Sequence, residues 1–281
     1  ESIPGYRTNV GIEEFISNVK KIGISMIGQT MNLAPADKKI YALRDSISCV
    51  DNIPLIASSI MSKKIASGAN KILIDVTVGK GAFMKTKEDA QRLAEQMIRI
   101  GNLVGREVRC ILTPMDEPLG YAVGNSLEVI EAINFLKGDM PKDLEEVVLE
   151  LGANMIQLAG KGNNIEENKI KMLENIENGT SYNKFKEMVK NQNGDISYLD
   201  DTTKFAKSKY ISAVVTKKTG LVKEINAEEI GKLACYLGAG RIRKEDKIEP
   251  EVGIILNKKV GDEVIKGDFL AYICANDEHK L

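Results

Sequence analysis

A strand–helix–strand pattern over residues 71–113 constrains the fold of this chain more than any other feature. Residues 71–78 and 107–113 are short apolar runs typical of buried strands. Between them, residues 87–103 place apolar side chains at every third or fourth position, the spacing of an amphipathic helix. Such a βαβ unit predicts an α/β fold with a mostly parallel central sheet and flanking helices.

Other segments add helices and a β-rich end to this unit. Residues 37–66 show a helical pattern that Pro54 divides into two helices. Residues 22–28 are predicted as another short buried strand, with helices over 128–136, 144–156, 170–176 and 182–189. From Phe205 on, short strands between tight turns predict a small β-rich module, over 211–216, 220–225, 253–256 and 269–273.

Composition excludes several classes of function for these 281 residues. The formal net charge of −1 offers no basic surface for nucleic acid, and no apolar run approaches the roughly 20 residues that span a membrane. The sequence has a single histidine, His279, close to its last residue. This excludes a Ser-His-Asp triad, a Cys-His pair and a multi-histidine zinc site built from these residues. The four cysteines are scattered without a C-x-x-C pair, which favours reduced thiols and a cytoplasmic location.

Three polar side chains form the most informative candidate for a binding site. Ser59 and Lys63 are four residues apart, so on a helix they lie on one face. Arg44 adds a planar fork of N–H donors. The set suits the edge of a uracil or thymine ring, which has two carbonyl acceptors beside one N–H donor. From spacing alone, however, the simpler interpretation of Arg44 and Asp45 is a surface ion pair.

Several longer stretches resemble the thymidine phosphorylase and pyrimidine-nucleoside phosphorylase family. They include Tyr41-Ala-Leu-Arg-Asp45, Gly79-Lys-Gly-Ala-Phe-Met84, and residues 33–39, 59–64 and 124–129. The resemblance covers nearly the whole chain, is weakest over about 160–201, and is closer to broad-specificity bacterial enzymes than to strict thymidine phosphorylases. It implies a glycosyltransferase of nucleoside salvage that exchanges the pyrimidine of uridine, thymidine or deoxyuridine for inorganic phosphate.

The resemblance also implies a division into domains. It assigns residues 1–35 to the start of the α/β domain, 36–67 to helices of a small all-α domain across a cleft, 68–204 to the rest of the α/β domain, and 205–281 to a β-rich C-terminal module. In the family, the phosphate loop and the catalytic histidine belong to a part that precedes these residues. We therefore expect the 281 residues alone to be inactive, and the whole protein to be a homodimer.

Roles for the candidate base site follow from the resemblance. Arg44 and Lys63 would donate to the carbonyl oxygens of the departing base as negative charge builds on them, and Ser59 would pair with the ring. The apolar walls around the ring would be Tyr41, Ile56 and Phe83. These six residues are the predicted substrate-binding set.

The resemblance further implies a potassium site and raises a question about one turn. The backbone carbonyls of Leu119 and Ala122 and the carboxylate of Glu131 would hold the ion, because hard cations take oxygen ligands. The Gly79-Lys80-Gly81 turn follows a strand, as phosphate-binding turns do, but it matches no established phosphate-loop pattern. Its role stays open.

Other functions stay open at this point. The choice between uridine and thymidine depends on residues outside the chain, so a strict thymidine phosphorylase is one alternative. Residues 261–270 resemble the turn of lipoyl and biotinyl carrier domains, although Lys280 falls later than the lysine those carriers modify. A phosphoribosyltransferase of the anthranilate type would need an acidic pair for magnesium that the sequence does not offer. A purely structural scaffold would not require Arg44, Ser59 and Lys63.

Overall fold

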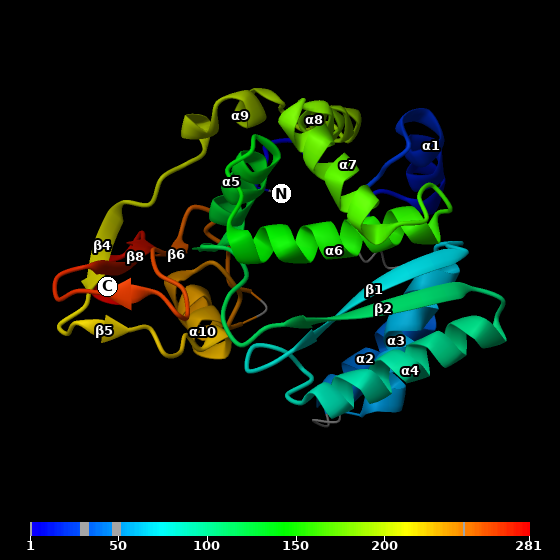
Figure 1. Ribbon diagram of the computed structural model, residues 1–281, viewed down its shortest axis with the longest axis horizontal. Helices are drawn as coiled ribbons and strands as arrows, with labels where there is room; N and C mark the ends of the chain where they lie inside the picture. The colour runs from blue at the N-terminus through cyan, green and yellow to red at the C-terminus, as the bar shows by residue number, and fades with distance from the viewer. Residues whose placement is uncertain (1, 29–33, 47–51, 244) are drawn as a thin grey trace.

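The centre of the molecule is the βαβ unit (Figure 1). The computed structural model describes residues 2–28, 34–46, 52–243 and 245–281, and for residues 45 and 46 the backbone alone. Strands β1 (Lys71–Val78) and β2 (Glu107–Pro114) are joined by helix α4 (Lys87–Leu103). They pair in parallel, with Lys71 opposite Glu107 and Val78 opposite Pro114. The predicted strand–helix–strand unit and the α/β class are confirmed.

Helices cover both faces of this two-stranded sheet, as parallel strands require. Figure 1 shows α6 (Lys142–Leu158) on one side, and α2 (Pro35–Ser46), α3 (Ile53–Ala66) and α4 on the other. Alternation along β1 turns Ile72, Ile74 and Val76 toward the core that contains α3 and α4. On the opposite face, Arg109 of β2 donates to the side chains of Asn154 and Gln157 on α6.

The helical pattern over 37–66 forms two helices, α2 and α3, on either side of the undescribed residues 47–51. Asn52 begins α3, because its side-chain oxygen accepts a hydrogen bond from the backbone N–H of Leu55 at 3.1 Å. Pro54 lies in the first turn of α3, where its missing N–H costs no helical hydrogen bond. Pro54 therefore helps to start the second helix.

Helix α3 uses two faces for two purposes. Ala57 and Met61 are one turn apart, are fully buried, and pack into the core beneath the sheet. Ser59 and Lys63 are offset from that pair by two residues, about 200° around the helix axis, so they face away from the sheet. The assignment of residues 36–67 to a separate small domain stays a prediction.

Helix α4 meets β2 so closely at Gly101 that a side chain has no room. A Cβ atom there would lie 2.1 Å from Cγ2 of Val108. Gly101→Ala should lower the free energy of unfolding by about 1–3 kcal/mol, because a packed core accepts an extra carbon only by shifting. Urea unfolding followed by circular dichroism measures this change.

Gly231 provides the matched control, because it lies in helix α10 (Ala227–Leu237) with no neighbouring atom within 4 Å of an added Cβ in the described structure. Gly231→Ala should raise the free energy of unfolding by about 1 kcal/mol, the ordinary gain of alanine over glycine in a helix. Equal shifts for the two variants would contradict the close packing of α4 on β2.

A second core lies among the helices beyond α6. It contains Ile133 of α5 (Asn125–Leu136), Val189 of α8 (Thr180–Asn191) and Leu199 of α9 (Ser197–Asp200). Helices α1 (Ile12–Ile22) and α7 (Ile165–Glu177) flank this layer (Figure 1). The helices predicted over 128–136, 144–156, 170–176 and 182–189 are all present, each longer than predicted by a few residues.

The strand predicted over residues 22–28 is wrong. Ile22 is the last residue of α1, and Gly23 ends the helix with a φ of 80°, a conformation that favours glycine. Beyond it, the backbone N–H and C=O of Met26 bond to the side chain of Gln192, and Gly28 N–H donates to Thr8. The apolar run lies against polar groups and has no neighbouring strand to pair with among the described residues.

The C-terminal module contains a four-stranded antiparallel sheet with the order β3-β6-β8-β4. Its strands are β3 (Ala122–Val123), β4 (Tyr210–Val215), β6 (Gly253–Leu256) and β8 (Phe269–Ala275). Strands β5 (Gly220–Leu221) and β7 (Glu263–Val264) form a separate pair, and α10 packs on the sheet through Leu237. Because β3 pairs with β6, this sheet begins in a segment that the sequence analysis placed in the α/β domain.

In the part of the chain that the structure describes, no helix combines the length and the apolar character needed to cross a lipid bilayer.

Candidate functional site

A small cavity of about 330 Å³ opens between α2, α3 and the turn after β1. We call it the small cavity; its lining is Tyr41, Arg44, Ile56, Ser59, Ile60, Lys63 and Phe83. All six side chains of the predicted substrate-binding set therefore surround one space. This observation places the residues together, while their roles toward a ligand stay predictions.

Arg44 is held firmly although its guanidinium is charged. The residue is only 4% exposed, and its Nη1 donates to the backbone carbonyl of Leu55 in the first turn of α3 at 3.2 Å. The guanidinium also lies over the ring of Tyr41, 5.6 Å from its centroid. These contacts fix a planar donor group at the wall of the small cavity. The side chain of Asp45, which the simpler interpretation of the sequence places in an ion pair with Arg44, lies outside the described residues.

Ser59 and Lys63 meet directly, as their helical spacing predicts. The Nζ atom of Lys63 donates to Oγ of Ser59 at 3.1 Å. The same ammonium forms an ion pair with Oδ2 of Asp37 on α2, also at 3.1 Å. Hydroxyl and ammonium are therefore coupled at one side of the small cavity, and none of the residues that line this cavity is acidic.

The turn after β1 supplies Phe83, which is largely exposed at the mouth of the small cavity. Two of the turn's backbone N–H groups are bonded within the protein, Gly79 to Met84 O and Gly81 to Met115 O. The N–H of Lys80 donates to Oδ1 of Asp116. Since the three amides already have acceptors, the turn as it stands offers no cradle for phosphate.

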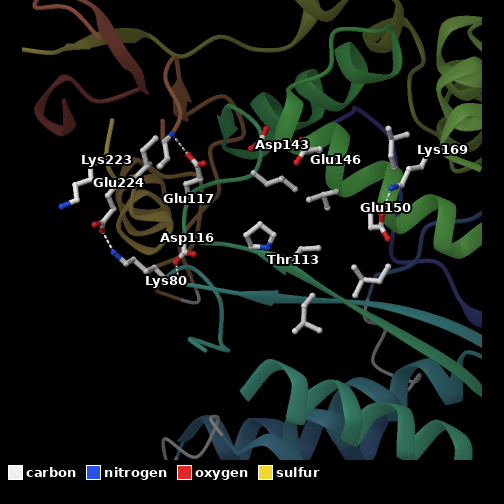
Figure 2. A pocket seen from close by; sticks show the side chains of 18 residues that line it. Lys80, Thr113, Asp116, Glu117, Asp143, Glu146, Glu150, Lys169, Lys223 and Glu224 are labelled. Atoms are coloured by element: carbon white, nitrogen blue, oxygen red, sulfur yellow. Dashed lines mark hydrogen bonds and ion pairs between the residues drawn. The ribbon is translucent and has the colours of Figure 1, made fainter. Parts of the chain in front are cut away.

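The glycines of this turn have a packing role instead. Gly79 has a φ of 134°, and a Cβ on it would lie 2.7 Å from the backbone nitrogen of Asp116. The turn therefore lies directly against the residues that follow β2. Figure 2 shows Lys80 beside Asp116 and paired with Glu224.

A larger cavity of about 760 Å³, which the sequence did not predict, lies at the carboxyl end of β2 (Figure 2). Its charged lining is mixed: Asp116, Glu117, Asp143, Glu146, Glu150 and Glu224 beside Lys80, Lys169 and Lys223. Several of these charges are paired with one another, as Lys169 is with Glu150 at 2.8 Å. Segments that are far apart in the sequence form this cavity, so no local sequence pattern predicts it.

Of the three predicted potassium ligands, the structure brings Ala122 and Glu131 together. Oε1 of Glu131 accepts the backbone N–H groups of Tyr121 at 2.7 Å and Ala122 at 3.2 Å. The contact of Ala122 with Glu131 is made by its N–H group, whereas the predicted ligand is its carbonyl. Leu119 lines the larger cavity nearby.

The surroundings of Glu131 favour a cation. Burial raises the pKa of this carboxyl above its ordinary value, and the charges of Asp143 and Glu128 raise it further, against the lowering effect of the two backbone N–H groups. Its Oε2 atom has no hydrogen-bond donor among the described residues and lies beside Gly120, where a Cβ would be 2.3 Å away. A partly buried carboxylate oxygen without a donor fits an oxygen-liganded cation.

The loop next to Glu131 contacts a cationic side chain of the protein itself. Lys259 of the C-terminal module donates to the backbone carbonyls of Pro118 and Gly120, and forms an ion pair with Asp143 at 2.8 Å. This ammonium fixes the loop that contains Leu119 to the C-terminal module. The sequence analysis gave Lys259 no role.

Comparison with known proteins finds family matches over most of the chain. A model of the "Glycosyl transferase family, a/b domain" matches residues 1–182, and a model of the "Pyrimidine nucleoside phosphorylase C-terminal domain" matches residues 221–281. The pyrimidine-nucleoside phosphorylase of Bacillus subtilis is 52% identical over 279 residues, 99% of this chain and 64% of that protein. The enzyme of the same name from Geobacillus stearothermophilus is 49% identical over 278 residues, again 99% of this chain and 64% of that protein. The chain thus spans about two-thirds (64%) of the length of the curated relatives it matches.

Proposed function

The chain belongs to the glycosyl transferase family, and on that premise we propose that the whole protein is a pyrimidine-nucleoside phosphorylase. Inorganic phosphate attacks the anomeric carbon of the nucleoside, and the bond to the base nitrogen breaks with its electron pair passing to the base. The departing base takes up the proton that hydrogen phosphate carries, so the products are the free pyrimidine and ribose or deoxyribose 1-phosphate. The observation that carries the proposal is the small cavity, in which Arg44, Ser59 and Lys63 of this chain lie together.

The three donors suit the charge that the reaction develops. As the base leaves, negative charge spreads onto its carbonyl oxygens, and donors that bind this charged form more tightly than the nucleoside lower the barrier. Arg44 and Lys63 would each donate to one carbonyl oxygen, and the Ser59 hydroxyl would bond to the ring nitrogen between them. Their positions are fixed before substrate arrives, by Leu55, Tyr41 and Asp37, so little reorganisation is needed.

Phosphorolysis by the full-length protein tests this proposal. Uridine, thymidine and deoxyuridine should each release free base in the presence of phosphate, and none should do so without it. Release from thymidine and deoxyuridine alone would favour the strict thymidine phosphorylase, and no release from any of them would overturn the proposal. A carrier module has little support, because Lys280 lies in the last turn of the described chain and donates to the Leu237 carbonyl at 3.3 Å.

A potassium ion is the second part of the proposal. The carboxylate of Glu131 and the carbonyls of Ala122 and Leu119 would hold it, and it would supply positive charge that fixes the loop after β2. Support comes from the acidic surroundings of Glu131 and from its Oε2, which lacks a donor among the described residues. Glu131 itself performs no proton transfer in this scheme.

Stability against pH and salt tests the potassium site. Because the pKa of Glu131 is raised in the folded protein, the folded state binds the proton more tightly. The stabilisation from this group is present below its unfolded value of 4.5 and is lost as the pH rises through the folded pKa. At pH 7 without potassium, Glu131→Gln should therefore raise the melting temperature by a few degrees.

Potassium chloride, compared with choline chloride at equal ionic strength, should stabilise the wild type by mass action and leave Glu131→Gln unchanged. Differential scanning fluorimetry of the full-length protein measures both effects. An equal response of the two proteins to potassium would remove Glu131 from the site.

We also propose that the whole protein is a cytoplasmic homodimer. Ile40 and Leu43 on α2 are large apolar side chains that stay mostly exposed, which supports a partner surface there. The cysteines Cys110, Cys235 and Cys274 are free thiols, which supports a reducing compartment.

A further inference from the structure

The small cavity has a charged neighbour that the sequence analysis passed over. Asp37 lies in the first turn of α2, and its side chain is 10% exposed beside the 24% exposed side chain of Lys63. Asp37 is not among the residues that line the small cavity. Any effect of Asp37 on a ligand in this cavity is therefore transmitted through Lys63.

The charges of Asp37 and Lys63 depend on each other. The Oδ2 atom of Asp37 is fully buried and accepts no well-aligned hydrogen bond among the described residues, so the ammonium 3.1 Å away is the group that balances its charge. A buried carboxylate without a countercharge is costly, which restrains the Lys63 side chain to this position. A lysine has four rotatable bonds and would otherwise sample many positions.

Lys63 is restrained from two sides. Its ammonium contacts Asp37 on one side and Oγ of Ser59 on the other, each at 3.1 Å. An ammonium has three N–H bonds, so these two contacts leave one N–H for a ligand in the small cavity. The direction of that N–H is set by the other two.

We infer that Asp37 is a positioning residue, which holds the Lys63 ammonium so that it donates to the departing pyrimidine. The inference rests on the proposed function and adds a residue to it. Asp37 belongs to α2 and Lys63 to α3, so the ion pair also fixes the two helices that form the walls of the small cavity. Without the carboxylate, the ammonium would stay attached to Ser59 but would lose its fixed direction.

Steady-state kinetics of the full-length protein tests the inference. Asp37→Asn should lower kcat about 10-fold, since a small misplacement of a reacting partner is expensive, and should leave the KM for phosphate unchanged. Asp37→Glu should restore most of the rate. In a Lys63→Ala background, Asp37→Asn should have no further effect, because its target is gone.

Glu187→Gln is the control, because it removes a carboxylate from an exposed ion pair with Lys184 on α8, on the opposite side of the β1–β2 sheet from α2 and α3 (Figure 1). It should leave kcat unchanged. A loss for Asp37→Asn that persists at full size in the Lys63→Ala background would overturn the positioning role, as would a rate within twofold of the wild type.

A second measurement separates this inference from the proposed function. If the wild type releases no base from any pyrimidine nucleoside, the proposed function fails. NMR relaxation of the ¹³Cε nucleus of Lys63 still decides whether Asp37 restrains it, without any turnover. Asp37→Asn should increase the mobility of this carbon, and unchanged relaxation would overturn the positioning role.

Discussion

Lys63→Ala in the full-length protein should lower kcat/KM for uridine by about 10²-fold, the usual loss when a donor to developing negative charge is removed. The ammonium of Lys63 lies at the wall of the small cavity, 3.1 Å from Ser59 Oγ. Its removal takes away one of two cationic donors to the base. Arg44→Ala should cause a loss of similar size, because it removes the other.

The neighbouring Lys64 offers a close control. It lies on the same turn of α3, is exposed, and is absent from the lining of the small cavity. Lys64→Ala should therefore leave kcat/KM within about twofold of the wild type, as surface changes generally do. Initial rates of uracil release measure all three variants. Near-normal rates for both Lys63→Ala and Arg44→Ala would remove these residues from the mechanism.

Met61→Ala should lower the free energy of unfolding by about 3 kcal/mol, because it leaves a cavity where a fully buried side chain now packs. Met61 joins α3 to α4 and β1 in the core beneath the sheet. The same helix presents Ser59 and Lys63 on its other face. Weaker packing of α3 on the sheet should therefore also reduce turnover. Urea unfolding measures the first effect and uracil release the second.

Met155 on α6 is the matched control, since it is 57% exposed. Met155→Ala should change the free energy of unfolding by less than about 0.5 kcal/mol. If Met61→Ala were no more destabilising than Met155→Ala, the packing of α3 on the sheet would be contradicted.

The elements whose pattern is local were predicted well from the sequence. Strands β1 and β2 were predicted from their short apolar runs, and helix α4 from apolar residues at three- and four-residue spacing. Both patterns can be recognised within a single short segment. The strand predicted over 22–28 failed because a strand needs a partner, and that partner is not specified by the apolar run itself. The extended strand predicted over 220–225 is likewise shortened to Gly220–Leu221, because Asn226 already caps helix α10.

Helix α10 was missed although its signals were present. Asn226 accepts hydrogen bonds from the backbone N–H groups of Glu228 and Glu229, and Gly238 ends the helix in the left-handed conformation. A search for these end signals would have found it within a region that otherwise suggests strands. The first-turn acids Glu228 and Glu229 are a further indication.

The residues of the candidate site also fall into those that local spacing predicts and those that it does not. Ser59 and Lys63 were predicted as neighbours because four residues make one helical turn, and the structure places them 3.1 Å apart. The role of Arg44 and the apolar walls came from the family resemblance, since no spacing rule connects one helix to the next. Asp37 lies in one of the stretches that carry the resemblance, but nothing indicated its role, because its relation to Lys63 exists only after α2 and α3 have packed.

The central claim is that Arg44, Ser59 and Lys63 bind one pyrimidine base together. A crystal structure of the full-length protein with uracil tests it most directly. We predict that the ring lies in the small cavity, with one carbonyl oxygen within hydrogen-bond distance of Arg44 and the other within reach of Lys63. A uracil bound elsewhere, with the small cavity still holding only water, would contradict the account.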